Sequence, residues 1–180
     1  MATNEAPAAT RDTVLRALRH TRQVRSFTDE PVSDADLHAI LEVCRWTGSS
    51  TNSQQWQFIV IRDADLRRRI GEISVHARYV GKAPLAIAIA MPGEDRETDA
   101  YDEGRVAERI LIAAGVMDLG AGIGWVDEAD YVRVGELLGV TPPAFVRTIV
   151  SIGHPTEQAR RPRTGPGTGR RPLEEFVRER

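Results

Sequence analysis

The sequence predicts an α+β domain with the layering of an α/β protein, in which helices cover one central sheet of mixed or antiparallel strands. Short apolar segments typical of buried strands alternate along the chain with longer segments of helical periodicity. The 180 residues are 41% hydrophobic, which is enough for one domain with its own core. No repeat or interior boundary divides the sequence. We therefore expect residues 11–180 to form a single domain that follows a flexible tail, residues 1–10.

Several segments carry apolar residues at helical spacing. Ser33 is a good N-cap for the second of them, because Asp34 and Asp36 follow in its first turn. The longest is apolar over most of its girth, which is typical of a central helix or of one at a subunit interface. The helices are expected at residues 11–20, from Ser33 to about Gly48, at residues 63–77, at residues 102–119 and near residues 129–138.

Three segments favour strands. Residues 56–61 are β-branched and aromatic, and residues 145–152 form a similar candidate near the end. Residues 83–91 are short and continuously apolar, which predicts a fully buried strand. Residues 120–124 are expected to form a glycine-rich turn after the longest helix, and residues 154–169, rich in Pro, Gly and Arg, are expected to be irregular.

Composition argues against several classes of protein. A net charge of −2 gives no reason to expect nucleic acid or a membrane surface as partner. Residues 83–91 are much shorter than the roughly 20 residues that cross a bilayer, and residues 1–10 lack the basic and apolar regions of a signal peptide. A cytoplasmic protein is therefore expected. Cys44 is the single cysteine and lies in an apolar helical segment, so a buried, inert thiol is expected.

Motifs for side-chain catalysis and for metal binding are absent from the sequence. The four histidines show no metal-ligand spacing, and neither a GxSxG elbow nor a GxxxxGK[ST] loop occurs. The glycines of residues 120–124 follow a helix, whereas a dinucleotide-binding fingerprint follows a strand. They are interpreted as a helix C-cap, or as backbone that must approach a flat ligand closely. The sequence therefore predicts no catalytic side chain and no metal.

Four short motifs resemble those of the nitroreductase family, in the order that the family has them. Residues 22–27 (RQVRSF) resemble its arginine-rich opening, and residues 49–56 (SSTNSQQW) resemble its P-S-x-x-N-x-Q-P-W element. Residues 119–125 (LGAGIGW) are similar to its L-G-L-G-x-x-W element, and residues 170–175 (RRPLEE) to its terminal R-R-P-L-E-E. Each motif alone is a weak signal, but together they cover about residues 12 to 180 and are specific.

The resemblance implies a nitroreductase-like FMN-binding fold and a homodimer with an FMN at each end of the interface. It implies that a C-terminal segment of each subunit crosses to its partner. The implied activity is that of an FMN-dependent oxidoreductase, which transfers hydride from NADH or NADPH through the flavin N5 to a small organic oxidant in a ping-pong cycle. Nitroaromatics, quinones and enones are all compatible oxidants.

The same resemblance implies the residues of the flavin site. Arg22 and Gln23 match positions that hold the flavin phosphate and ribityl chain. Arg25 matches the cation at the pyrimidine edge, where a fixed positive charge stabilises the reduced flavin electrostatically. The polar positions that reach the flavin from the partner subunit match Ser49, Ser50 and Asn52. The turn whose backbone passes the flavin N5 matches Gly124, Trp125, Val126 and Asp127. The remaining implied position is a phosphate-binding arginine, matched by Arg170.

The chain departs from the family pattern near the implied phosphate site. Thr21 and Thr168 stand where basic residues are common, Gln23 replaces a serine, and Gln55 replaces the proline before Trp56. Phosphate binding then depends on fewer charges, or on arginines between residues 160 and 163. Two other functions therefore stay open, namely an FMN-binding protein without turnover and a flavin-free dimeric relative.

Overall fold

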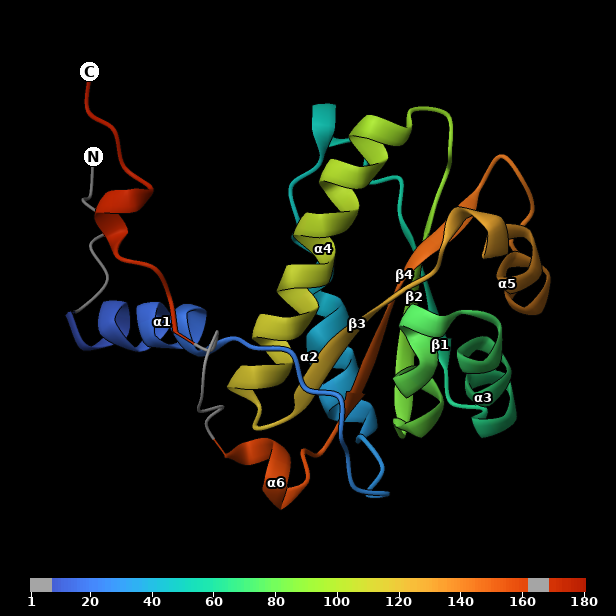
Figure 1. Ribbon diagram of the computed structural model, residues 1–180, viewed down its shortest axis with the longest axis horizontal. Coiled ribbons are helices and arrows are strands. Elements are labelled where there is room, and N and C mark those ends of the chain that lie inside the picture. The colour runs from blue at the N-terminus through green and yellow to red at the C-terminus, as the bar shows by residue number, and fades with distance from the viewer. Residues whose placement is uncertain (1–7, 162–168) are drawn as a thin grey trace.

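The computed structural model describes residues 8–161 and 169–180, which form a four-stranded sheet covered by helices (Figure 1). The strands and α-helices are β1 (Gln57–Ile61), β2 (Leu85–Met91), β3 (Gly120–Trp125) and β4 (Phe145–Gly153), with α1 (Ala8–His20), α2 (Asp34–Arg45), α3 (Ala64–Ile73), α4 (Arg96–Val116), α5 (Tyr131–Leu138) and α6 (Glu157–Arg160). The strands pair antiparallel in the order β1-β2-β4-β3, so the predicted α+β class is confirmed. No described helix has both the length and the apolar composition that a membrane span requires.

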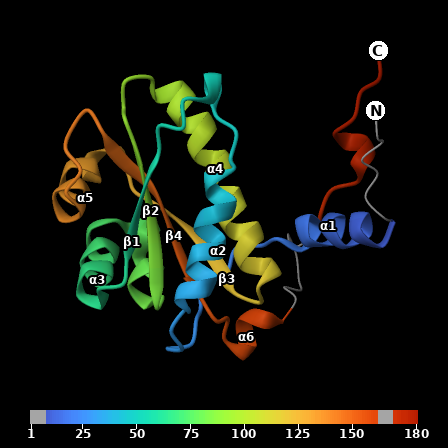
Figure 2. The same ribbon diagram turned by 180° about the vertical axis from the view of Figure 1, so that it is seen from behind.

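The two faces of the sheet pack against different helices. Helices α2 and α4 lie on one side, and α3 and α5 lie on the other together with a 3-10 helix, Val75–Lys82 (Figures 1 and 2). Strand β2 shows the division most clearly. Its leucine, isoleucines and methionine pack toward α2 and α4, whereas its alternate alanines pack toward α3 and α5. Every side chain of β2 is buried, as predicted for this segment. Full burial of each large side chain of β2 stabilises the folded protein by roughly 1.5–3 kcal/mol.

The expected turn at residues 120–124 is wrong, because these residues form β3, an edge strand of the sheet. The left-handed residue that follows α4 is Asp118, with φ of 57°, so these glycines are not its C-cap. Residues 23–24 pass directly over β3, where Val24 donates its N–H to Ala121 O at 2.8 Å. A Cβ atom at Gly122 would lie 2.3 Å from Val24 O. Glycine is therefore needed at this position because the chain approaches itself.

Helix α4 begins at Arg96, six residues before the predicted start, and Asp95 caps it by accepting N–H groups from its first turn. Its N-terminal turns carry three buried carboxylates, each of which binds a different segment. Asp99 accepts the N–H of Gly93 at 2.8 Å, Asp102 accepts that of Ser50 at 3.1 Å, and Glu103 pairs with an arginine of β4. Burial raises the pKa of Glu103, although Thr148 and Arg147 oppose the shift. Apolar periodicity gave no sign of the turns before residue 102, whose buried side chain, that of Asp99, is charged.

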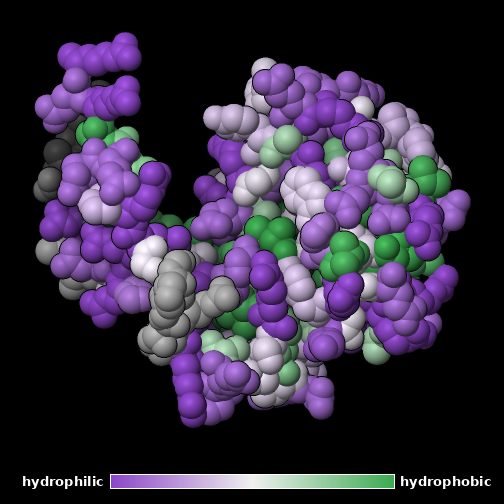
Figure 3. Space-filling view, viewed as in Figure 1, coloured by the Kyte–Doolittle hydropathy of each residue, from purple (hydrophilic) through white to green (hydrophobic). Residues whose placement is uncertain are grey.

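Helix α1 and residues 169–180 project from the same side of the body, and we call them together the terminal arm (Figures 1 and 2). Figure 3 shows the arm separated from the upper part of the body by an open notch. The arm exposes large apolar side chains from both of its segments: Val14, Leu15, Leu18, Leu173, Phe176 and Val177. Burial of such side chains is the main favourable term in association, so the arm has an apolar surface suited to another chain.

The thiol of Cys44 is expected to be inert in the native protein. It is completely buried in the core between α2 and α4, and burial raises its pKa to about 12. Because the thiolate is the reactive form, a chromogenic disulfide reagent at pH 8 should label the native protein far more slowly than the same protein in denaturant. Rapid labelling of one thiol per native chain would contradict this prediction.

Candidate functional site

Residues 22–25 lie along β3, where hydrogen bonds fix two of them. Gln23 forms an isolated parallel bridge with Ala121, and its side-chain oxygen accepts the N–H of Ile123 at 2.7 Å. The N–H groups of the Gln23 side chain have no hydrogen-bond partner among the described residues and remain available to a ligand. This segment therefore presents polar groups from a backbone that β3 holds in place.

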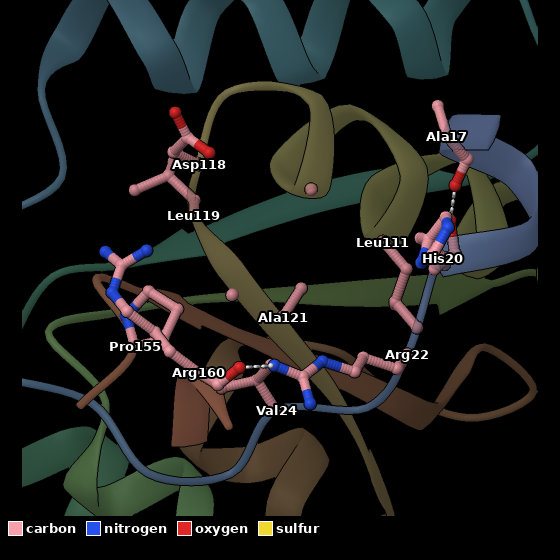
Figure 4. Close-up of a pocket in the computed structure, with 13 residues that line it drawn as sticks. Ala17, His20, Arg22, Val24, Leu111, Asp118, Leu119, Ala121, Pro155 and Arg160 are labelled. Carbon is pink, nitrogen blue, oxygen red and sulfur yellow. Dashed lines mark hydrogen bonds between the residues drawn. The ribbon is translucent and has the colours of Figure 1, made fainter. Parts of the chain in front are cut away.

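Arg22 donates to backbone carbonyls at the end of α6 rather than projecting toward open space (Figure 4). Its guanidinium contacts Ala159 O, Arg160 O and Arg161 O at 2.7–3.0 Å. Thr21, at the position of a family arginine, donates its hydroxyl to Ala17 O at 2.9 Å. Both side chains border a pocket of about 250 Å³ between the ends of α1, α4 and α6. In this conformation Arg22 stabilises the protein's own backbone.

Arg25 is a cation with no carboxylate partner among residues 8–161 and 169–180. Its guanidinium carbon lies 5.0 Å from the centre of the Tyr79 ring, within the range of a cation–π interaction. The Tyr79 hydroxyl is buried and has no hydrogen-bond partner in the described part of the chain, and burial raises its pKa. Tyr79 was not singled out from the sequence, because nothing local to residue 79 indicates its contact with Arg25.

The polar loop of residues 49–54 holds an unusual backbone conformation. Thr51, Asn52 and Gln54 have φ of 50°, 58° and 49°, which places three non-glycine residues in the left-handed region. Asp102 fixes the loop from α4 through Ser50 N, and Ser49 Oγ accepts the N–H of Gln54 at 2.9 Å. Such strain persists where surrounding structure enforces it and clusters at ligand sites. The exposed side chain of Asn52 is therefore presented in a defined position.

The two groups of implied site residues lie near opposite ends of α4 in one chain. Ser49, Ser50 and Asn52 lie beside its N-terminal half, whereas residues 22–25 lie beside its C-terminal end (Figure 1). A helix of 21 residues is about 31 Å long. The described chain therefore does not bring these groups together by itself.

The residues at the end of β3 are tightly held. Ser74 donates its hydroxyl to Trp125 O at 3.0 Å, and Val126 donates its N–H to Arg147 O at 2.8 Å. Gly124 packs against the 3-10 helix, where a Cβ would lie 3.2 Å from Ala77 Cβ. Trp125 is 47% exposed, and Asp127 is half-buried.

Arg170 lies in the exposed terminal arm and has no hydrogen-bond or ion-pair partner among the described residues. Thr168 and Arg163, which bear on the implied phosphate site, fall outside the described residues. Arg160 borders the pocket that Arg22 also lines (Figure 4).

Comparison with known proteins supports the resemblance. Residues 18–77 match the family model described as Nitroreductase family. An FMN reductase [NAD(P)H] from Bacillus subtilis is 26% identical over 174 residues, which cover 83% of this chain and 69% of that protein.

Two solved structures show the same likeness, one of them over nearly the whole chain. A protein from Desulfovibrio desulfuricans, solved in complex with FMN, is 27% identical with a TM-score of 0.78 and covers 98% of both chains. An FMN-dependent nitroreductase from Clostridium difficile is 26% identical with a TM-score of 0.74, and covers 79% of this chain and 88% of that one. The fold, the order of the motifs and these similarities agree: the chain is similar to the nitroreductase family, whose model matches residues 18–77.

Proposed function

We propose that this chain is an FMN-dependent oxidoreductase that takes hydride from NADH or NADPH and delivers it to a small organic oxidant of the nitroaromatic, quinone or enone type. The observation that carries the proposal is Arg25, a cation beside Tyr79 with no carboxylate partner in the described part of the chain. The full-length likeness to a protein solved with FMN supports the cofactor. We further propose that the enzyme works in the cytoplasm, where both nicotinamide donors are available.

The residues of the candidate site fit the ring of FMN more clearly than its phosphate. When bound, FMN supplies the position that accepts and returns a hydride. Arg25 would stabilise negative charge on the pyrimidine edge, because a guanidinium stays protonated and donates in a fixed plane. Residues 124–127 would line the N5 edge, and no catalytic side chain or metal is needed. Gln23 would donate to ribityl oxygens, and Arg170 would bind the phosphate. Arg22 fits this role only if it leaves the carbonyls of α6.

We propose that the working unit is a homodimer built from one domain per chain, residues 11–180. The separation of the two groups of site residues along α4 supports this, because a second chain can supply the polar loop to the Arg25 end. The apolar side chains of the terminal arm support it as well, and residues 169–180 would cross to the partner. Helix α4 also exposes Tyr101 and Val116.

Absorbance spectra of the purified protein test the function. With added FMN we expect a bound-flavin band that bleaches under nitrogen with NADH or NADPH and recovers with a quinone. A bound band that neither donor bleaches would favour the FMN-binding protein without turnover. No bound band at saturating FMN would contradict the proposal and favour the flavin-free relative.

A further inference from the structure

A β-bulge in β4 turns the side chain of Arg147 toward α4. Where β2 pairs with β4, Ile89 faces Thr148 and Ala90 faces Val146, which leaves Arg147 as an extra residue. Val146 and Ile149 consequently pack in the same core cluster, although strict alternation would put residues three apart on opposite faces. Bulges redirect side chains in this way and are over-represented beside active sites.

The redirected guanidinium of Arg147 pairs with Glu103 on α4. Arg147 Nε donates to Glu103 Oε2 at 2.9 Å, and Nη2 donates to the same oxygen. Glu103 is almost fully buried, and its other oxygen has no hydrogen-bond partner among the described residues. Removing one partner of such a pair leaves the other charge buried and uncompensated. The pair therefore fixes Arg147 in one orientation.

Arg147 in turn contacts the end of β3 with both its backbone and its side chain. Its carbonyl accepts the N–H of Val126 at 2.8 Å, and its guanidinium carbon lies 5.3 Å from the centre of the Trp125 ring. Ser74 holds Trp125 O through its hydroxyl. Residues 125–126 are thus attached to the 3-10 helix and to β4, and through β4 to α4.

We infer that Glu103 is a positioning residue of the proposed flavin site, which acts through Arg147 on residues 125–127. The inference rests on the proposed function, because the family resemblance puts the backbone of these residues beside the flavin. Glu103 lies behind Arg147 and holds the arginine's guanidinium against Trp125. Loss of the Glu103 carboxylate would release both the guanidinium of Arg147 and the ring of Trp125. A displacement of about 1 Å at a reacting position can cost on the order of 100-fold in rate.

The test compares Glu103→Gln with Glu72→Gln, a matched change in an exposed ion pair with Arg68 on α3. In Glu103→Gln, hydrogen exchange at the Val126 amide should be faster without added flavin, while the amides of α3 keep their wild-type rates. Bleaching of bound FMN by NADH should be about 10- to 100-fold slower, with FMN affinity within about twofold of wild type. Glu72→Gln should match wild type in every measurement.

Two outcomes would overturn the inference alone. The first is unchanged exchange at residues 125–127 in a folded Glu103→Gln protein, and the second is faster exchange with an unchanged bleaching rate. A wild-type protein that binds no FMN would overturn the proposed function as well. If Glu103→Gln does not fold, the double variant Glu103→Leu/Arg147→Met leaves no stranded charge and should fold. Slow bleaching in the double variant supports the inference, and wild-type bleaching contradicts it.

Discussion

A dimer of one Arg25→Met chain and one Asn52→Gly chain should regain about half of the wild-type rate of FMN bleaching, because a symmetric dimer has two equivalent sites. In each site of the proposed dimer, Arg25 comes from one chain and Asn52 from the other. One site of the mixed dimer then carries both changes, and the other carries neither. Each variant alone has the same defect in both of its sites. For Arg25→Met alone we expect a loss of about 100-fold, the usual cost of removing a fixed electrostatic stabiliser.

The substitutions are chosen to leave the fold intact. Methionine keeps an aliphatic stem over the Tyr79 ring, and glycine accepts the left-handed backbone of Asn52 without strain. The two chains carry different affinity tags so that the mixed dimer is purified alone. Arg69→Met, on the exposed face of α3, is the control and should keep the wild-type rate. A mixed dimer as inactive as its parents would refute the shared site.

Gly122→Ala should destabilise the protein severely. The added Cβ would lie 2.3 Å from Val24 O, and this oxygen belongs to a backbone segment that hydrogen bonds and Gln23 hold against β3. When the backbone itself has to move to relieve overpacking, the protein loses about 3 kcal/mol or more of stability. For a domain of this size such a loss lowers the melting temperature by roughly 10 °C. Thermal unfolding followed by circular dichroism measures it.

The neighbouring glycines of β3 provide graded controls. A Cβ at Gly120 would lie 2.6 Å from a methyl group of Val24, and one at Gly124 would lie 3.0 Å from a methyl of Val80. We expect the loss of stability to decrease from Gly122→Ala through Gly120→Ala to Gly124→Ala. Adding Val24→Ala should recover part of the loss at position 120 and none at position 122. An equal effect at all three positions would show that the clash with Val24 O is not the cause.

Features encoded within a few residues were predictable from the sequence. The N-cap at Ser33 does accept the N–H of Asp36, and the continuous apolar run became the buried strand β2. The prediction failed at β3, because its glycines allow close contact with residues 22–25, a segment about 100 residues away. It failed again at the start of α4, where two of the three buried acids have partners in distant segments.

The candidate site shows the same limit. The motifs name Arg25 and the polar loop, but not the buried hydroxyl of Tyr79 or the carboxylate of Asp102 that holds the loop. Arg147 was equally hidden, because its orientation depends on a bulge that only the register of β2 and β4 defines. Arg22, assigned to a phosphate by its motif, donates in this conformation to the carbonyls of α6. Whether these residues bind FMN stays a prediction for the experiments above.

The strand order has a consequence for synthesis on the ribosome. β2 lies between β1 and β4, so its second edge cannot be paired until residues 92–144 and then β4 itself have emerged. At roughly 5–20 residues per second, that interval is about 3–11 s. Throughout it the nascent chain displays an unpaired strand of sequence LAIAIAM, which carries no charge and no proline. Translation speed across this span therefore governs how long each new chain is exposed to aggregation and to capture by chaperones.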